Sequence, residues 1–565
     1  MKRKEAFFMA MALSVSMLAG CGNDSGGNGG NDGGGDSGND GAGQTAESGS
    51  GSEASQEEST SSGGEENGGS EGLAVVTFFD KNSGSKLFDD RVAQEIMKRT
   101  GVKVEIQNPT GDPSEKLSLL LAGRDYPDIV LMDRGSDIVS KYIDAGALVA
   151  LDDYMDRLPN VKEMYGDVLN KTRYKDGKNY YLSNWYGYDP DPVAGFIMKY
   201  TYMVDIVGQE RADSPEPFTQ DEMFEILKQF KEKYPEIDGK ETFGMTMNGD
   251  AKNYFNTLKG MYGMKTYYKD GDGILHWDVY DPNYIKMLHF VNDLYTAGLL
   301  DTEWVVNNNT LCTQKLSAGN IMGCFNAYWD PGDANSAIKA SEEGEKGQYV
   351  AYKVLGDGIA ADETTSGGRS SLGWDAIAIT NNCQDIDAAL KLIDFCASQE
   401  GQDLMLWGIE GEDWTKEGDK YIPNADVVAR LKTEGNDAVE ELGICRWTWF
   451  VKNEGHSDGT PSRIANTEQD WATRMAWQNL TDTYWDTAEF DALEPSGSTP
   501  EGLKFQKVKD IFDQAFPQMV NAASSDEVDT LYQKMLQDME AAGLADVEKV
   551  INENYQARME LWGMN

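Results

Sequence analysis

Strand-length apolar runs alternate with helix-length periodic segments directly after Gly72, and this alternation limits the folds open to the chain. The strand candidates are rich in β-branched and aromatic residues, whereas the helix candidates repeat apolar residues every three or four positions. In chain order these segments are LAVVTFFD (73–80), a helix over 89–100, VKVEIQ (102–107), a helix around 114–122 and PDIVLMD (127–133). Short connections in this order predict a parallel sheet covered by helices.

Acidic residues follow two of these strands. Asp80 comes directly after the first run, and Asp133 ends the last one. Because ligands of such sheets bind beyond the carboxyl ends of the strands, both side chains are predicted to lie where a ligand would bind.

A second folded segment is predicted to begin near Phe196. Further helices are expected over 219–231, where Thr219 and Glu222 have capping-box spacing, over 282–298, over 385–398, and over 528–561 with a break at Gly543. A chain of 565 residues is long enough for two or three domains. No repeat of solenoid length is present.

The first 72 residues differ sharply from the rest. Three basic residues precede an apolar run that is shorter than the ~20 residues of a membrane span, and the run ends in Leu-Ala-Gly-Cys21, which resembles the lipobox of bacterial lipoproteins. A truncated transmembrane helix is the alternative. Residues 1–20 are therefore predicted to be a lipoprotein signal peptide, with Cys21 lipidated at the extracellular face of the cytoplasmic membrane. Residues 21–72, without Lys or Arg, are predicted to be a disordered acidic Gly/Ser-rich tether.

Charge and metal-binding residue types exclude several functions. The formal charge of −46 repels phosphate backbones, so no nucleic acid partner is expected, while neutral or cationic ligands are tolerated. Six cysteines without a CxxC pair and three separated histidines predict no metal centre, and no cofactor is expected. The five cysteines after Cys21 are predicted to be mostly buried and reduced, with two disulfides at most. Asp270-Gly271-Asp272-Gly273 is predicted to be a hairpin turn rather than a calcium loop, because the later ligands are missing.

Aromatic residues cluster beside acids, amides and bases. The clusters are NWYGYDPD (184–191), FNAYWD (325–330), GWD (373–375) and CRWTWF (445–450). A flat ring covers the apolar face of a sugar while neighbouring polar groups bind its hydroxyls, so this pattern is typical of carbohydrate sites. The alternative is that these aromatic side chains are core residues.

No catalytic motif accompanies these clusters. The sequence lacks a nucleophile elbow, a zinc-protease helix and a phosphate-binding glycine loop in a suitable context. A surface glycoside hydrolase or lyase using an acid pair stays open as an alternative, as does a binding protein for a non-sugar solute.

Several stretches in register, behind the lipobox, resemble the extracellular solute-binding lipoproteins of bacterial ABC importers, family 1, especially the large Firmicutes type. They are AGRDYPDIVLMD (122–133), YKDGKNYYLS (174–183), DPNYIKMLHFVNDLYTAGLLDTE (281–303) and the segment 374–414 with its GIEG turn (408–411). Two prolines usual in the family are absent. Ser183 stands in place of the one after the YKDGKNYYL stretch, and Asp385 or a neighbour stands in place of the one before the helix of segment 374–414. The resemblance runs from about 73 to 560.

The resemblance implies an α/β, two-lobed periplasmic-binding-protein-like fold of type II. Each lobe would be a mostly parallel sheet flanked by helices, with the ligand in the interlobe cleft. The lobes would be discontinuous: 73–190 with 374–425, and 191–373 with 426–565. The implied function is non-enzymatic: a monomer captures a carbohydrate, usually an oligosaccharide, and delivers it to ABC permease subunits.

The expected ligand-binding residues come partly from the resemblance and partly from the strand ends and aromatic clusters. The resemblance implies Asp80, Trp185, Tyr186, Tyr328, Trp329, Trp374, Asp375 and Glu410. The strand ends and clusters add Asp133, Tyr188, Arg446 and Trp447.

Overall fold

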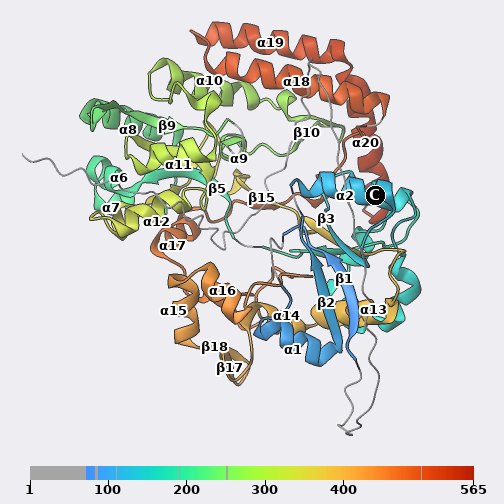
Figure 1. Cartoon of the computed structure of the whole chain (residues 1–565). Coiled ribbons are helices and arrows are strands. Elements are labelled where there is room, and N and C mark those ends of the chain that lie inside the picture. The colour runs from blue at the N-terminus through green and yellow to red at the C-terminus, as the bar shows by residue number, and fades with distance from the viewer. Residues whose placement is uncertain are drawn as a thin grey trace, which may run out of the picture.

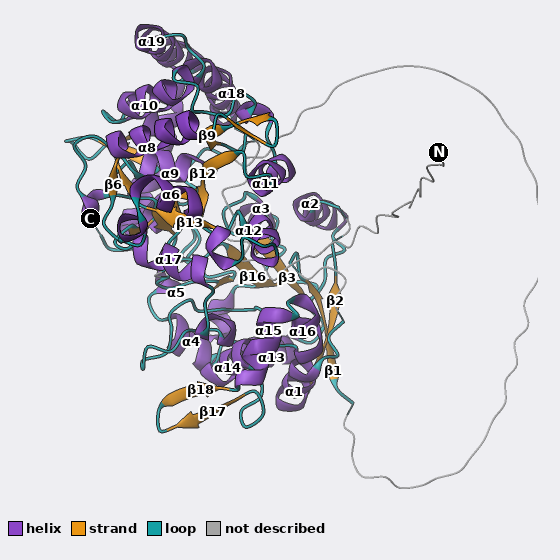
Figure 2. Ribbon diagram, turned by 90° about the vertical axis from the view of Figure 1, so that its left-hand side faces the viewer, coloured by secondary structure: helices purple, strands orange, loops and turns teal. Residues whose placement is uncertain are grey.

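The computed structural model describes residues 72–82, 87–109, 111–189, 191–249, 252, 254–497 and 499–564, which form two α/β lobes (Figures 1 and 2). The predicted signal peptide, Cys21 and all of the predicted tether except Gly72 lie outside the described residues.

The first lobe is built on a five-stranded sheet in the order β2-β1-β3-β16-β4. Its strands are β1 (Ala74–Phe79), β2 (Val102–Gln107), β3 (Ile129–Asp133), β4 (Leu182–Asn184) and β16 (Asp375–Ile379). β1 pairs parallel with β2 and β3, whereas β16 runs antiparallel to β3 and β4.

Helices cover this sheet, and two of them show why they begin where they do. The Asp90 side chain accepts from the Ala93 N–H at 2.8 Å and caps α1, and Ser398 caps α14 in the same way. The remaining elements of the lobe are α1 (Arg91–Thr100), α2 (Pro113–Gly123), α3 (Ile138–Asp144), α4 (Pro159–Tyr165), α5 (Val168–Lys171), α13 (Ile386–Cys396), α14 (Gln399–Trp407), β17 (Trp414–Glu417), β18 (Lys420–Pro423), α15 (Ala425–Thr433) and α16 (Asn436–Leu442).

The second lobe is built on a four-stranded sheet in the order β13-β5-β12-β9. Its strands are β5 (Ala194–Lys199), β9 (Phe243–Thr246), β12 (Ile321–Ala327) and β13 (Tyr349–Tyr352). β5 is antiparallel to both of its neighbours, and β12 is parallel to β9.

Helices and short strands surround the second sheet, and the long helices α18 and α19 lie side by side along the outer edge of the lobe (Figure 1). The helices are α6 (Tyr200–Val207), α7 (Gln209–Ala212), α8 (Gln220–Lys233), α9 (Tyr254–Gly260), α10 (Tyr284–Thr296), α11 (Asn309–Ser317), α12 (Gly332–Ala340), α17 (Trp471–Asn479), α18 (Pro500–Val520), α19 (Ser525–Ala542) and α20 (Leu544–Leu561). The short strands are β6 (Phe218–Thr219), β7 (Glu236–Ile237), β8 (Lys240–Glu241), β10 (Tyr267–Lys269), β11 (Leu275–Trp277), β14 (Val354–Leu355), β15 (Gly367–Arg369) and β19 (Tyr484–Asp486).

Both sheets are mixed, which corrects the expectation of mostly parallel sheets. The chain crosses between the lobes in three segments, residues 185–193, 370–374 and 465–470, which we call the crossing segments. β5 and β16 each begin directly after a crossing segment, at the edge where neighbouring strands end. A strand that starts at that edge has to run against the strands that finish there, so each sheet contains antiparallel pairs.

The predicted helix signals are confirmed. Thr219 and Glu222 form a reciprocal capping box at the start of α8. Asp385 caps α13, and α10 occupies the centre of its predicted range. Gly543, at φ 103°, separates α19 from α20.

The residues weighed for metal binding have structural roles. The segment from Asp270 to Gly273 is a hairpin turn between β10 and β11, with the Asp270 carboxylate accepting from two backbone N–H groups of the loop, at 2.9 Å each. The five described cysteines form no disulfide with one another, and three of them, Cys312, Cys324 and Cys396, are buried.

The third boundary between the lobes differs from the predicted one at 425. Val427, Trp447, Trp449 and Ile464 pack in the same core as Phe78 of the first sheet, whereas residues from Trp471 onward belong to the core of the second lobe. The Trp449 indole holds this segment on the first lobe, because its ring centroid lies 4.8 Å from that of Phe78 in β1.

We predict that Gly373→Ala strongly destabilises the fold. Gly373 has φ +70°, and a Cβ there would lie 2.1 Å from the Asn184 carbonyl oxygen, so a backbone shift is required. The expected loss in free energy of unfolding is about 3 kcal/mol or more, measured by urea denaturation.

Gly358 provides a matched control. It has a similar φ of +78° with nothing within 4 Å of the added Cβ. Gly358→Ala should therefore cost only the ~1 kcal/mol of left-handed backbone strain. Equal losses for the two variants would contradict the close approach of the crossing segments.

Candidate functional site

Residues that follow separate strands in the sequence lie together at one edge of the first sheet. Asp375, at the start of β16, pairs in register with both Asp133 and Asn184. Because β1 runs parallel to β3, its carboxyl end lies at this edge as well. The edge therefore carries Asp80, Asp133, Trp185, Trp374 and Asp375.

The second sheet has a corresponding edge. Ala327 at the end of β12 pairs with Ala194 at the start of β5. Directly beyond this pair, the Tyr328 hydroxyl donates to the Asp191 carboxylate, with distances of 2.9 and 3.2 Å to its two oxygens. Trp329 lies edge-on to Tyr328, with ring centroids 4.9 Å apart. We call these two regions the hinge edges.

Backbone hydrogen bonds join the chain segments that run between the hinge edges. The Gly187 N–H donates to the Ser371 carbonyl at 2.8 Å, which links the first two crossing segments. The Tyr186 N–H donates to the Val451 carbonyl at 3.0 Å, and the Asn453 N–H donates to the Tyr186 carbonyl at 2.8 Å. The first two crossing segments are therefore bonded to each other, and Tyr186 is bonded to the segment around Val451 in the first lobe.

Strained backbone marks this connection. Trp185 has φ +59° and Phe450 has φ +57°, both in the left-handed region that bulky residues rarely adopt. The Asn453 side chain holds Trp185 in place by donating to its carbonyl at 2.8 Å. Such residues cost about 1–3 kcal/mol each and cluster at sites where function requires them.

Aromatic rings form a partly exposed surface at the first hinge edge. The half-buried indoles of Trp185 and Trp374 stack nearly parallel, with centroids 5.4 Å apart and planes inclined by 10°. The Arg463 guanidinium lies 5.2 Å from the Trp185 ring. Close in sequence, Tyr188 is 52% exposed and meets Tyr484 edge-on at 4.8 Å.

A cluster of charged and aromatic residues occupies the second hinge edge. Arg369, in β15, forms an ion pair with Asp189 and approaches Asp191 to 3.7 Å. Its guanidinium carbon lies 5.5 Å from the centre of the Trp329 ring. Burial raises the pKa of Asp191 to about 6 despite the opposing charge of Arg369.

The carboxylates that end the first sheet are engaged by the protein itself. Asp375 is fully buried and pairs with Lys81 at 2.8 Å, and burial raises the pKa of this carboxyl group. Asp80 accepts from the Trp449 indole N–H at 3.0 Å. Asp133 is half-buried and accepts from the Gly135 N–H at 2.9 Å. These carboxylates order the edge as well as carrying charge to it.

Two of the predicted ligand-binding residues are core residues instead. Tyr186 is 1% exposed and stacks on Tyr165 at 4.1 Å. Trp447 is fully buried, and its indole N–H donates to the Asp90 carboxylate at 2.7 Å. Their positions fit the alternative that aromatic side chains in these clusters serve packing.

Two further predicted residues contact parts of the first lobe away from the hinge edges. The Arg446 Nε lies 3.5 Å from the Asp90 carboxylate that caps α1, and its Nη1 donates to the Glu440 carbonyl. Glu410 is exposed in the turn after α14, where it pairs with Trp414. Neither position supports a ligand contact.

Sequence reasoning missed four polar residues of the site. Asp189 and Asp191 stand inside the NWYGYDPD cluster, so their neighbourhood carried a signal. Arg369 and Arg463 belong to none of the quoted motifs. Only the pairing of β15 with β19, and the path of the chain just before the third crossing segment, bring these arginines to the aromatic residues.

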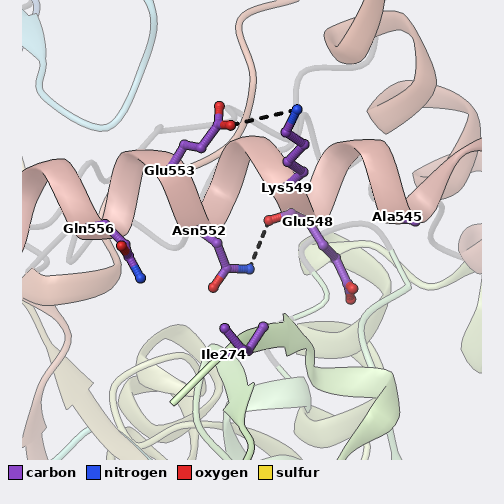
Figure 3. A pocket seen from close by; sticks show the side chains of 7 residues that line it. All are labelled: Ile274, Ala545, Glu548, Lys549, Asn552, Glu553 and Gln556. Carbon is purple, nitrogen blue, oxygen red and sulfur yellow. Dashed lines mark hydrogen bonds and ion pairs between the residues drawn. The ribbon is translucent and has the colours of Figure 1, made fainter. Parts of the chain in front are cut away.

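A separate pocket of about 350 Å³ lies between α20 and the β10–β11 hairpin (Figure 3). Two of its polar residues bind the hairpin: Asn552 accepts from the Leu275 N–H and donates to the Leu275 carbonyl, and Glu548 accepts from the Trp277 N–H. These side chains cover the edge of β11, so the pocket is a feature of packing.

The described part of the chain contains neither a metal-binding cluster nor a membrane-spanning helix. No group of three or more His, Cys, Asp or Glu residues there is arranged to hold a metal ion. No helix in the same residues has the length and apolar character needed to span a membrane.

Comparisons with known proteins agree with this architecture. The family described as bacterial extracellular solute-binding protein matches residues 80–403. The polygalacturonan/rhamnogalacturonan-binding protein YtcQ of Bacillus subtilis is 25% identical over 339 residues, which is 59% of this chain and 65% of YtcQ. The fructooligosaccharide ABC transporter substrate-binding protein FusA of Streptococcus pneumoniae is 22% identical over 345 residues, 57% of this chain and 60% of FusA. Lipoprotein LipO of Bacillus subtilis is 24% identical over 334 residues, covering 56% of this chain and 63% of LipO. The chain spans less than two thirds of the length of these curated relatives.

Solved structures show the same fold. The HMO-binding, ABC-transporter-associated solute-binding protein of Bifidobacterium longum infantis superposes with a TM-score of 0.66 at 17% identity, covering 86% of this chain and 99% of that one. An EF-hand mutant of Streptococcus pneumoniae FusA in complex with fructo-nystose gives a TM-score of 0.59 at 17% identity, covering 85% of this chain and 99% of that one.

We predict that Asp191→Asn changes how stability depends on pH. The folded pKa of about 6 lies above the unfolded value of about 3.9, so the folded state binds the proton more tightly. The resulting stabilisation is complete below about pH 4 and is lost as the pH rises through about 6. Relative to Asp191→Asn, the wild type should gain about 2–3 kcal/mol in free energy of unfolding between pH 7.5 and pH 4.

Chemical denaturation at several pH values measures this difference. Asp272→Asn, in the exposed hairpin turn, removes a carboxylate away from the site and should change the pH dependence little. A constant difference between wild type and Asp191→Asn over this range would show that burial does not perturb Asp191.

Proposed function

The chain belongs to the bacterial extracellular solute-binding protein family, which is non-catalytic, and from that premise we propose that it captures an oligosaccharide and delivers it to the permease of an ABC importer. The observation that carries this proposal is the presence of partly buried aromatic surfaces at both hinge edges. Trp185 and Trp374 supply one of them, and Tyr328 and Trp329 supply the other.

The chemistry of these surfaces suits a sugar. Indole faces cover the C–H faces of a pyranose or furanose ring, and the adjacent Asp and Arg side chains exchange hydrogen bonds with its hydroxyls. Two relatives, YtcQ and FusA, have names that specify oligo- or polysaccharide ligands, which supports the same ligand class here.

Binding is proposed to close the lobes over the ligand. A ligand that touches Trp185 on one lobe and Trp329 on the other gains contacts only when the hinge edges approach each other. It therefore shifts the population toward the closed state. The strained backbone at Trp185 lies in the first crossing segment, where this rotation would be absorbed.

The proposed place of action is the extracellular face of the cytoplasmic membrane. There Cys21 carries the lipid anchor and residues 21–72 form a tether. The relative LipO is named a lipoprotein, which supports this assignment. A tether lets a monomeric receptor sample the solution and still meet its permease.

We predict that Trp185→Ala and Trp374→Ala each weaken oligosaccharide binding about tenfold or more, because loss of one stacking face costs about 1.4 kcal/mol or more. A panel of oligosaccharides is first screened by thermal shift, where a ligand at 100 times its Kd stabilises by about 2.7 kcal/mol. Affinities of the hits are then measured by calorimetry.

Tyr295→Ala is the control for this experiment. Tyr295 is a half-buried aromatic residue on α10, which lies at the outer side of the second lobe (Figure 1). Its loss should leave affinity unchanged. Absence of any saccharide hit, or conversion of the bound sugar into products, would refute the proposed function.

The proposed lipid anchor at Cys21 can be tested separately from ligand binding. Cys21→Ala removes the acceptor sulfur, so the variant should be released into the culture medium with its oligosaccharide affinity unchanged. Fractionation of cells and medium followed by immunoblotting measures the distribution. Retention in the membrane fraction would mean that the apolar N-terminal run itself anchors the chain.

A further inference from the structure

The end of α20 reaches from the second lobe onto the first. α20 packs in one hydrophobic cluster with Phe490 and the β10–β11 hairpin of the second lobe. Directly after its last residue, the Trp562 indole N–H donates to the Lys171 carbonyl at 3.1 Å, and the Lys171 ammonium lies 5.4 Å from the centre of the same indole. Lys171 ends α5, whose Val168 and Leu169 pack against the core of the first lobe. One side chain of the second lobe therefore holds the first lobe by a hydrogen bond and a cation–π contact.

An ion pair joins the two lobes as well, beside the second crossing segment. Asp491 of the second lobe accepts from the Arg134 guanidinium of the first lobe at 2.5 Å, and both side chains are largely buried. The same guanidinium donates to the Gly373 carbonyl at 2.6 Å and to the Ser370 hydroxyl at 3.0 Å. Because Ser370 and Gly373 belong to the second crossing segment, this pair lies at the connection between the lobes.

Arg558, on α20, connects these two contacts within the second lobe. Its Nη1 donates to the Glu489 carbonyl at 3.0 Å, two residues before Asp491. Its guanidinium carbon lies 5.8 Å from the centre of the Trp562 indole. The charge of Asp491 acts on Arg558 as well as on Arg134. The end of α20 and the segment that carries Asp491 therefore form one unit that faces the first lobe.

A rotation of the lobes affects the two contacts differently. A rotation about the crossing segments displaces an atom in proportion to its distance from them. The Arg134–Asp491 pair touches the second crossing segment, whereas α20 runs along the side of the molecule, away from the middle where β15 leads into that segment (Figure 1). A hydrogen bond is lost once its heavy atoms are about 3.6 Å apart. A small rotation therefore breaks the contact between Trp562 and Lys171 before it disturbs the ion pair.

We propose that Trp562 is a latch that stabilises the arrangement of the lobes described here and has to release when the lobes rotate. A hydrogen bond together with a cation–π contact favours one arrangement by about fivefold in population. The consequence for ligand binding rests on the proposed function. A ligand that closes the lobes has to break the latch, so part of its binding free energy is used for that step.

The first experiment measures the distance between the lobes without any ligand. Leu119→Cys on α2 and Val306→Cys before α11 place one fluorophore on each lobe, at residues that are each 69% exposed. The full chain also carries Cys21→Ala, so that the lipid-acceptor thiol is not labelled, and the same chain without the two new cysteines measures background labelling. Single-molecule energy transfer should show that Trp562→Ala lowers the population of the wild-type distance about fivefold relative to other distances.

Two variants control this measurement. Leu561→Ala removes an exposed apolar side chain next to Trp562 and should leave the distance distribution unchanged. Lys171→Ala removes the ammonium but keeps the carbonyl acceptor, so its effect should be smaller. The double variant should change the distribution no more than Trp562→Ala alone, because both substitutions act on one contact.

The distance distribution decides whether the latch exists. The same distribution in wild type and Trp562→Ala would overturn the proposal. If Trp562→Ala unfolds the end of α20, as circular dichroism would show, Trp562→Phe decides instead, because it keeps an aromatic ring there and removes the N–H donor.

The second experiment tests the consequence for ligand binding. Calorimetry with the best saccharide of the thermal-shift panel should give at least threefold tighter binding by Trp562→Ala and unchanged binding by Leu561→Ala. Equal or weaker binding by Trp562→Ala, together with a changed distance distribution, would overturn the link to ligand binding and leave the latch standing. Failure of every saccharide to bind the wild type would refute the proposed function, whereas the distance measurement would still decide on the latch.

Discussion

The side-chain amide of Asn184 is the interaction on which the order of the first hinge edge depends. It is fully buried at the end of β4, where its Nδ2 donates to the Thr448 carbonyl at 2.9 Å and approaches Asp375 at 3.4 Å, while its Oδ1 accepts from the Val451 N–H at 2.7 Å. One amide thus links the end of the first sheet, the start of β16 and the segment that leads toward the third crossing. Asn suits this role because it both donates and accepts, and each of its bonds is formed out of water.

Close approach at this point determines the residues around it. Gly373 has no side chain because the Asn184 carbonyl occupies the space of a Cβ. Trp185 then follows in a left-handed conformation, which turns its indole onto Trp374. The backbone geometry at Gly373 and Trp185 therefore also builds the aromatic surface, so the proposed binding surface and the connection between the lobes are parts of one structure. A ligand on that surface would act directly on the crossing segments.

The sequence predicted local structure well and long-range structure less well, for physical reasons. The capping box at Thr219, the break at Gly543 and the hairpin turn at Asp270 depend on neighbours in sequence, and all are observed. The edge position of Asp375 was expected from the family resemblance, but its pairing with Lys81 depends on the sheet order. Trp447 and Tyr186 were assigned to the ligand site although both are buried. An aromatic residue beside a polar one gives the same sequence pattern in a core and in a binding site. Arg369 was missed because a lone arginine has no sequence motif, and only the pairing of β15 with β19 brings it to the aromatic residues.

The excess of carboxylates has one effect at long range and another at short range, and the two together make an acidic receptor compatible with a polar ligand. The formal charge of −46 is screened beyond about 8 Å at physiological ionic strength, so at long range it affects solubility more than ligand choice. At the hinge edges, Asp189 and Asp191 lie beside the aromatic surface proposed to bind the ligand and are partly shielded from solvent. There a carboxylate is a strong acceptor for a hydroxyl and a strong repellent for another carboxylate. The acids that make the chain soluble outside the cell and those that would orient a sugar are thus chemically the same, and burial alone separates their roles.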